Sequence, residues 1–311
     1  MLIRAPTRTV RDFHSDSRHW DSYTPRPEDI VIGTAAKVGT TWTSQIVNLL
    51  VFQSAEPRSI NAASPWLDAR FQAPLAVMLG MIEAQTHRRF IKTHLPLDAL
   101  PFYDEVRYIH TARDGRDACM SYFHHLHSHT PQAWANFDQI GLSDPTIGCP
   151  IPRPPATARE FFHDWLDAPG AHTADGFLAL ESTYWARRRE PNVLLVHYND
   201  LKADLDGEMR RISAFLDIPV DESLWPSLVE AATFEAMKRD GDTVLAGMEH
   251  GFVGGHRSFL NKATNGRWQG EVDETDLARW RVKIDAVLSA NLVAWLEGGR
   301  AAAGNPRDAA D

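Results

Sequence analysis

An apolar run, a loop of small residues and a helical pattern follow one another early in the chain, and this succession constrains the fold most. Residues 29–34 read DIVIGT and are rich in β-branched side chains, as in a buried strand. Residues 41–52 carry apolar side chains at helical spacing. The intervening loop, GTAAKVGTTW over residues 33–42, brings backbone N–H groups and the positive end of the helix dipole to one point. The segment therefore predicts an anion-binding loop between a strand and a helix.

The residue types in this loop suit a phosphate-like anion. Lys37 supplies a compact positive charge, Gly39 allows close backbone approach, and the hydroxyls of Thr40 and Thr41 add donors. The loop is not a Walker A motif, GxxxxGK[ST], because its lysine precedes the second glycine by two residues. Taken alone, the segment is also consistent with a plain turn that carries a solvated lysine.

Three further apolar runs read as buried strands, each ending in polar residues: 89–93, 106–112 and 192–198. Helical patterns lie between and after them, the clearest over residues 201–216. Strands that alternate with helices imply βαβ units, so we expect an α/β fold, a P-loop-like three-layer sandwich with a central, mainly parallel sheet flanked by helices. Ligands of such sheets bind beyond the carboxyl ends of the strands.

Irregular segments interrupt this pattern. Residues 128–155 contain many Pro, Gly and His residues, and we interpret them as a long loop of the kind that often serves as a lid. Residues 241–270 are rich in glycine and irregular, and a terminal amphipathic helix follows over residues 277–295. We find no linker or repeat, so we expect one domain over residues 1–297 and a flexible tail over residues 298–311.

The composition argues against several classes of protein. A formal net charge of −9 at pH 7 disfavours nucleic acid as a partner, because polyanion binding needs basic excess. No apolar stretch approaches the roughly 20 residues that span a bilayer, so we expect no stable membrane insertion. The two cysteines build no disulfide framework, and the start of the chain lacks the apolar run of a signal peptide. The cytoplasm is the expected compartment.

The end of the run at residues 106–112 bears on metal chemistry. A magnesium-dependent NTPase would want a carboxylate at such a strand end, but the next residue here is Arg113. We therefore favour a metal-free transfer over an NTPase and assign no metal ligands.

The chain resembles a bacterial-like member of the cytosolic sulfotransferase family in ordered motifs: KVGTTW from Lys37, KTHLP from Lys92 and RDGRDACMSYFHH from Arg113. The family pattern is a Lys-x-Gly-Thr-Thr-Trp loop, a Lys-Thr-His strand end, an Arg with a Ser eight residues later, and a late Lys-Gly-x-x-Gly-x-Trp segment that ends here at Trp268. The resemblance implies metal-independent, in-line transfer of a sulfuryl group from 3'-phosphoadenosine 5'-phosphosulfate (PAPS) to a hydroxyl or amine of a small-molecule acceptor.

The first motif would hold the reactive end of this donor. By resemblance, Lys37, Gly39, Thr40 and Thr41 bind the 5'-phosphosulfate, and Trp42 stacks near the adenine. A lysine ammonium at the bridging oxygen stabilises the charge that develops on the leaving phosphate.

The strand end supplies the expected base. Lys92 and His94 alternate on one strand, so their side chains share a face and can converge on one bound group. By resemblance, His94 is the general base, and Lys37 and Lys92 complete the catalytic set. An imidazole with a pKa of about 6.5 accepts a proton from an attacking hydroxyl.

The third motif would bind the 3'-phosphate of the nucleotide. Arg113 and Ser121 match the family's pair for this phosphate, and the planar fork of arginine suits it. A structural alternative pairs Arg113 with Asp114 or Asp117.

Residues later in the chain match positions where the family contacts adenosine. These are Tyr198, which follows the last predicted strand, and Thr233 with Phe234. Both aromatic residues could equally belong to the core.

The late segment departs from the family pattern. It reads NKATNGRW, so Asn261 stands where the pattern has an arginine and Ala263 where it has the first glycine. We assign Asn261, Lys262, Ala263 and Arg267 to the donor site. Because the expected arginine is replaced, we hypothesise that Arg257 or Arg267 supplies its charge.

Histidines follow the third motif: His124, His125, His127 and His129. A metal site is one interpretation, but their spacing lacks a cysteine or carboxylate framework, so we favour an acceptor-pocket wall or solvent exposure. The loop over residues 128–155 would form the acceptor lid. Candidate pocket residues, for which core packing is an equal explanation, are aromatic: Phe71, Phe123, Trp134 and Phe137.

Three classes of function stay open. A sulfotransferase uses PAPS without metal, a P-loop nucleotide kinase or NTPase needs magnesium and a nucleoside triphosphate, and a non-catalytic nucleotide-binding protein binds without transfer. The identity of the acceptor and the oligomeric state also stay open. Family members often form homodimers, but the short dimer motif is not found after Trp268.

Overall fold

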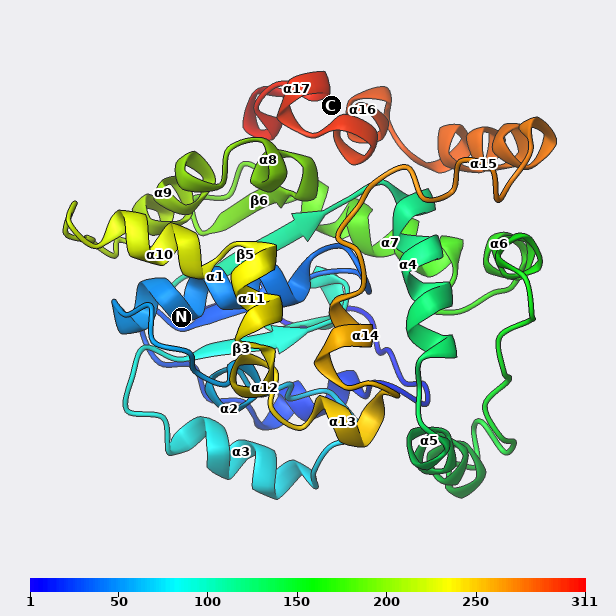
Figure 1. Ribbon diagram of the computed structural model, residues 1–311, viewed down its shortest axis with the longest axis horizontal. Coiled ribbons are helices and arrows are strands. Elements are labelled where there is room, and N and C mark those ends of the chain that lie inside the picture. The colour runs from blue at the N-terminus through cyan, green and yellow to red at the C-terminus, as the bar shows by residue number, and fades with distance from the viewer.

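A four-stranded parallel sheet lies at the centre of the molecule, whose computed structural model describes residues 1–311 (Figure 1). The strands lie in the order β3-β2-β5-β6. A separate antiparallel pair joins β1 to β4. The bounds are β1 Leu2–Arg4, β2 Ile30–Gly33, β3 Phe90–Thr93, β4 Phe102–Tyr103, β5 Arg107–Ala112 and β6 Val193–His197.

The helices surround this sheet. None of them combines the length and the apolar character that crossing a membrane requires. In chain order they are α1 Thr40–Phe52, α2 Ile60–Ala63, α3 Leu75–Glu83, α4 Gly115–His127, α5 Pro131–Ser143, α6 Ala158–Asp167, α7 Ala174–Trp185, α8 Tyr198–Ala203, α9 Leu205–Phe215, α10 Trp225–Ala231, α11 Phe234–Arg239, α12 Gly241–Val244, α13 Met248–Gly251, α14 His256–Leu260, α15 Glu274–Val287, α16 Ala290–Gly298 and α17 Arg300–Ala303. Short 3-10 turns cover Ser17–Ser22, Leu97–Ala99 and Pro306–Asp308.

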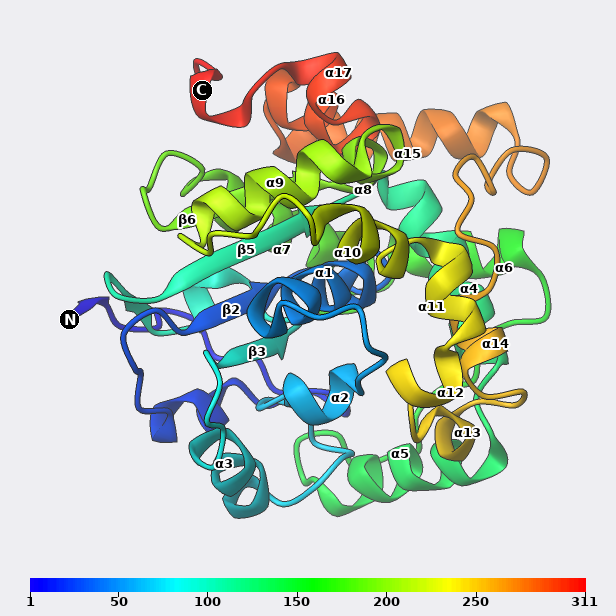
Figure 2. The same ribbon diagram turned by 60° about the vertical axis from the view of Figure 1, so that its left-hand side comes forward.

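Both faces of the sheet are covered, which gives three layers (Figure 2). Side chains alternate between the faces along a strand, and in β2 all of them are buried. Ile30 and Ile32 join the apolar cluster formed with α1, α9 and α10, whereas Val31 joins the larger cluster formed with α4, α6 and α7. The predicted α/β sandwich with a parallel sheet is confirmed.

The central position of β2 creates the binding crevice. The connection from β2 leads to β3 on one side, whereas the connection from its neighbour β5 leads to β6 on the other, so the two connections leave in opposite directions. In parallel sheets such a point opens a crevice beyond the carboxyl ends of the strands. The loop after β2 therefore lies where a ligand is expected.

The segment 128–155 was predicted as a loop, and this prediction is wrong in its first half. Residues Pro131–Ser143 form α5, which begins at Pro131 because the side chain of Thr130 accepts the backbone N–H of Ala133. Proline fits the first turn of a helix, where its missing N–H is not needed. Likewise, the glycine-rich segment 241–270 contains three short helices, α12 to α14.

Two predicted helices are each divided by a capping side chain. The helix predicted over residues 201–216 is split into α8 and α9 at Asp204, whose carboxylate accepts the N–H of Gly207 at 2.9 Å. The helix predicted over residues 277–295 is split into α15 and α16 at Ser289, whose hydroxyl accepts the N–H of Leu292 at 3.3 Å. A hydroxyl or carboxylate that caps a new helix favours such a break.

The end of the chain is more structured than its small, polar residues predict. Residues 300–303 form α17, and Pro306 is buried. The buried Arg188 donates to the carbonyl of Pro306 at 2.8 Å and to that of Ala309 at 3.0 Å. These contacts hold the last residues against the turn that follows α7.

Candidate active site

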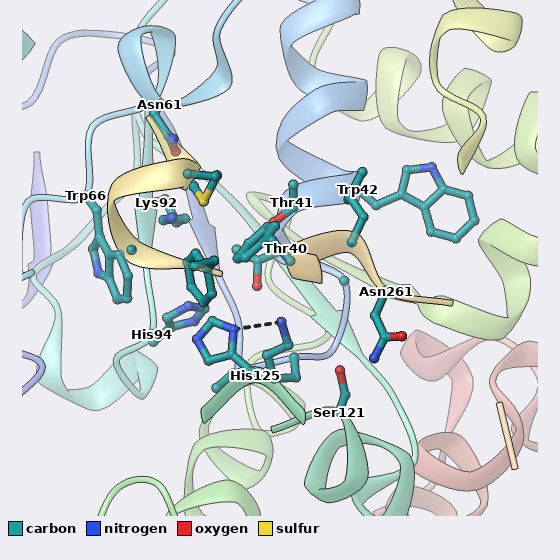
Figure 3. A pocket seen from close by; sticks show the side chains of 18 of the residues that line it. Thr40, Thr41, Trp42, Asn61, Trp66, Lys92, His94, Ser121, His125 and Asn261 are labelled. Carbon is teal, nitrogen blue, oxygen red and sulfur yellow. Dashed lines mark hydrogen bonds between the residues drawn. The ribbon is translucent and has the colours of Figure 1, made fainter. Parts of the chain in front are cut away.

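A cavity of about 1210 Å³ opens beyond the carboxyl ends of the strands (Figure 3). Its wall includes every residue that the sequence assigned to the donor site or to catalysis. These are Lys37, Gly39, Thr40, Thr41, Trp42, Lys92, His94, Arg113, Ser121, Tyr198, Thr233, Phe234, Asn261, Lys262, Ala263 and Arg267. The fold thus brings together residues from both halves of the chain.

The charge of the wall is opposite to that of the whole chain. Although the net charge is −9, Glu235 is the only carboxylate among the lining residues. The basic side chains of the wall are Lys37, Lys92, Arg113, Lys202, Lys262 and Arg267. The cavity is therefore suited to a ligand with several negative charges.

The loop between β2 and α1 has the shape that an anion site needs. Gly39 caps α1 with a φ of 119°, and an added Cβ would lie 3.1 Å from the ring of Tyr198. Glycine is required there for both reasons. The hydroxyl of Thr40, the first residue of α1, lies 2.6 Å from that of Thr34. The free N–H groups of the first turn of α1 point to the cavity end of this loop.

Lys37 projects from this loop into the cavity. Its Nζ lies 3.2 Å from His125 Nδ1 and 4.8 Å from the ring centre of Phe259. The dashed line at the labelled His125 in Figure 3 marks the first of these contacts. Burial lowers the pKa of Lys37 to about 7, helped by the nearby charges of Arg113 and Lys92. The protein supplies no carboxylate partner, so an anionic ligand would stabilise the charged lysine.

Lys92 and His94 approach the same space from the end of β3. Burial lowers the pKa of Lys92 to about 8, and its Nζ lies 4.4 Å from the ring centre of Trp66. His94 Nδ1 lies 2.9 Å from the carbonyl oxygen of Thr34, so the ring donates its proton there. Nε2 then carries the free lone pair. Burial, with the charge of Lys92, lowers the pKa of His94 to about 3, which keeps the ring neutral.

Arg113 is held by the late segment of the chain. Its guanidinium donates to Asn265 Oδ1 at 2.8 Å and to the carbonyl of Thr264 at 2.9 Å, and it lies 4.2 Å from the ring centre of Tyr198. The alternative pairing of Arg113 with a neighbouring aspartate is not formed, because Asp114 pairs with Arg116 at 2.6 Å. Asn265 is a site residue that the sequence did not reveal.

The other neighbouring aspartate orders the late segment. Asp117 accepts the backbone N–H of Gly266 at 3.1 Å and of Arg267 at 3.0 Å. Arg267 lines the cavity, and burial followed by the charge of Arg113 lowers its pKa. Arg257 is exposed and lies outside the cavity wall. Of the two arginines considered as substitutes for the arginine replaced at Asn261, only Arg267 lines the cavity.

Aromatic residues also line the polar half of the cavity, which contains Lys37, Arg113 and Arg267. Trp42 donates its indole N–H to the carbonyl of Ala232 at 2.8 Å, and its ring lies 5.4 Å from that of Tyr198. Thr233 caps α11 by accepting the N–H of Ala236, and this cap places Phe234 at the first position of the helix. The three rings therefore line the cavity together with the loop between β2 and α1.

The other half of the cavity is largely apolar. Of the predicted pocket aromatics, Phe71 and Phe137 line it, at 5.3 Å from each other. Phe123 is instead buried against Phe161, and Trp134 lies under the guanidinium of Arg153 at 4.3 Å. Further lining residues of this half are Phe13, Trp66, Met78, Met81 and Phe252.

The histidines after the third motif lie in different surroundings. His125 and His129 line the cavity, and burial lowers the pKa of each. His127 is exposed, with Nε2 2.9 Å from the carbonyl of Pro155. No group of three or more His, Cys, Asp or Glu residues is arranged to hold a metal ion. Two of the four histidines thus belong to the pocket wall.

The backbone of the late segment is strained. Ala263 has a φ of 51° and Asn261 a φ of 49°, and a positive φ costs an alanine about 1–2 kcal/mol. We expect Ala263→Gly to raise the free energy of unfolding by about 0.5–1 kcal/mol, because the relieved strain exceeds the extra entropy of the unfolded chain. Urea unfolding measures this change. The control Ala168→Gly, at a φ of −75°, is expected to lower stability, and equal losses in both variants would contradict the expectation.

The chain was compared with known proteins. The family model "Sulfotransferase domain" matches residues 27–291. A glycolipid sulfotransferase of Mycobacterium bovis is 32% identical over 317 residues, which cover 93% of this chain and 94% of that protein. A luciferin sulfotransferase of Photinus pyralis is 28% identical, and the match covers 80% of this chain and 68% of that protein.

Solved structures share the fold. One is a retinol dehydratase in a complex with retinol and PAP, with a TM-score of 0.67, 23% identity and coverage of 88% of this chain and 84% of that one. Another is a mouse sulfotransferase complexed with PAP, with a TM-score of 0.65 and 17% identity. The match covers 89% of this chain and 90% of that one.

Proposed function

Because this chain belongs to the sulfotransferase family, we propose that it transfers a sulfuryl group from PAPS to a hydroxyl of a small-molecule acceptor, with His94 as general base. The observation that carries the proposal is the convergence of Lys37, Lys92 and His94 on one cavity beyond the strand ends. An amine acceptor is the alternative within the same chemistry.

The donor fits the polar half of the cavity. Its 5'-phosphosulfate would bind the loop before α1, its 3'-phosphate would bind Arg113 and Arg267, and its adenine would lie between Trp42 and Phe234. The basic wall supports this placement, since PAPS carries several negative charges. The PAP in the two solved structures is the nucleotide that remains after sulfuryl transfer.

The proposed reaction is an in-line displacement at sulfur. The acceptor oxygen forms a bond to sulfur as the bond between sulfur and the 5'-phosphate oxygen breaks. The acceptor proton passes to His94 Nε2, and the electron pair of the broken bond leaves with PAP. Lys37, which lines the cavity, would face the leaving oxygen, where negative charge develops, and would therefore stabilise the transition state more than the ground state.

The apolar half of the cavity supports an acceptor with an apolar portion. Phe71, Phe137 and Met78 would cover this portion, whereas the reacting hydroxyl lies toward His94. The related sulfotransferase of Mycobacterium bovis is named for glycolipids, a substrate class with this amphiphilic character.

Radiolabelled PAPS tests the function directly. The protein is incubated with phenols, aliphatic alcohols, amines and glycans in the presence of EDTA, and labelled products are separated. We expect transfer without added metal. Phosphoryl transfer from magnesium ATP without sulfuryl transfer would support a kinase, and donor binding without any transfer would support a non-catalytic binding protein.

We propose that Arg267 binds the 3'-phosphate in place of the arginine that the family pattern has at Asn261. We expect Arg267→Ala to weaken PAP binding about 10–100-fold, because a charge-assisted bond to the 3'-phosphate is lost. Calorimetry with PAP and with AMP, which lacks that phosphate, checks the origin of the loss. AMP binding should change little, and the control Arg257→Ala should leave both affinities unchanged. Equal losses for PAP and AMP would remove Arg267 as the substitute.

A further inference from the structure

The N-terminal segment places a second histidine beside the proposed base. The ring centre of His14 lies 6.1 Å from that of His94, with 27° between the ring planes, and both rings line the same cavity. His14 also packs edge-on against Trp66, with ring centres 4.6 Å apart. The proposed transfer uses His94 and leaves His14 without a role.

A local turn and a neighbouring histidine position His14. Asp12 Oδ1 accepts the backbone N–H of His14 at 2.8 Å and that of Ser15 at 2.7 Å. Asp12 Oδ2 lies 3.3 Å from His172 Nε2, and these two buried atoms form no hydrogen bond elsewhere. The His172 ring in turn lies 4.7 Å from that of His14. Two chain segments that are distant in sequence therefore support one imidazole.

His14 retains unused hydrogen-bonding capacity. Its Nδ1 lies 3.4 Å from the hydroxyl of Ser15, and Nε2 has no hydrogen-bond partner in the protein. Burial lowers the pKa of His14 well below its usual value, so the ring is neutral and offers one donor and one acceptor. Polar atoms in such a wall are normally paired, here with a ligand or water.

From this geometry we infer that His14 binds a second hydroxyl of the acceptor while His94 takes the proton from the first. The site then selects acceptors that carry neighbouring hydroxyls, as sugars and other polyols do, over acceptors with one hydroxyl. Asp12 and His172 are positioning residues for His14. The inference rests on the proposed sulfuryl transfer and specifies the class of its acceptor.

The wall around His14 suits a sugar ring. Such a ring has apolar C–H faces and a polar edge of hydroxyls. The ring of Phe71, whose centre lies 4.9 Å from that of His14, offers an aromatic surface, and Asn61 and Asn136 add amide groups to the cavity wall. Hydroxyls at the edge of the ring require polar partners of this kind, because burying them unpaired is costly.

Two acceptors with the same alkyl chain test the inference: n-octyl β-glucoside and 1-octanol. At saturating PAPS, we expect wild-type kcat/KM to be at least about tenfold higher for the glucoside. His14→Phe keeps an aromatic ring of similar shape but removes the polar atoms. It should lower kcat/KM for the glucoside about tenfold, mainly through KM, and leave octanol within about twofold. His14→Gln, which keeps a donor and an acceptor, should recover part of the preference.

The ratio between the two acceptors separates recognition from structural damage. His127→Phe, at an exposed histidine outside the cavity, should leave the ratio unchanged, and PAP affinity should stay the same in all variants. Equal loss of both activities in His14→Phe, or no loss, would overturn the inference. Wild-type transfer to 4-nitrophenol alone would overturn it as well but leave the proposed function intact. No wild-type transfer to any of these acceptors would count against the proposed function itself.

Discussion

Replacement of His94 by alanine is expected to lower kcat for sulfuryl transfer by about 10²–10⁴-fold while PAP binding persists. The orientation of the ring gives the reason. Nδ1 donates to the carbonyl of Thr34, so Nε2 is the only ring atom left to accept the acceptor proton. Single-turnover transfer measures the chemical step, and calorimetry with PAP measures binding. His127→Ala, an exposed histidine outside the cavity, serves as the control and should retain full activity.

The pH profile gives a second test of His94. Burial lowers its pKa to about 3, so the ring stays neutral, and able to accept a proton, from pH 8 down to pH 5. A base with an ordinary pKa of about 6.5 would instead become protonated over this range and lose activity. We therefore expect kcat/KM for the acceptor to show no loss of activity as the pH falls through about 6.5.

Full turnover by His94→Ala would refute the assignment of His94 as the base.

The residues next to regular elements could be predicted from the sequence. Lys37 follows β2, His94 follows β3 and Arg113 follows β5, and parallel strands bring these carboxyl ends to one edge of the sheet. Motif order then identified which polar residues lie there. The same strand and helix patterns predicted the sheet and its two covered faces.

The residues that support these side chains could not be predicted. Asn265 reaches Arg113 from a loop far along the chain, and an amide in an irregular segment has no distinguishing pattern. Thr34 orients His94 through its backbone carbonyl, which every residue type possesses. His14 lies in a segment without helical or strand periodicity, so its approach to His94 depends wholly on tertiary packing.

Replacement of Lys37 by methionine is expected to lower kcat by about 10²–10³-fold, a loss typical of removing one group that stabilises transition-state charge. Methionine keeps much of the length of the side chain, so its contact with Phe259 is retained while the charge is lost. PAP binding should weaken less than kcat falls, because the charge on the leaving oxygen develops fully only during transfer. Rapid-quench single turnovers compared with PAP calorimetry measure the two effects. Lys238→Met, outside the cavity wall, is the matched control.

The dependence on pH gives a second test of the charge on Lys37. With a pKa of about 7, Lys37 of the free enzyme is charged below that pH and becomes neutral above it. Since the neutral lysine attracts the donor less, kcat/KM for PAPS should fall as the pH rises above about 7. In Lys37→Met the fall should begin near pH 8, where Lys92 loses its charge. An unchanged profile in the variant would show that another group titrates, and Lys37 would then bind the donor without controlling its capture.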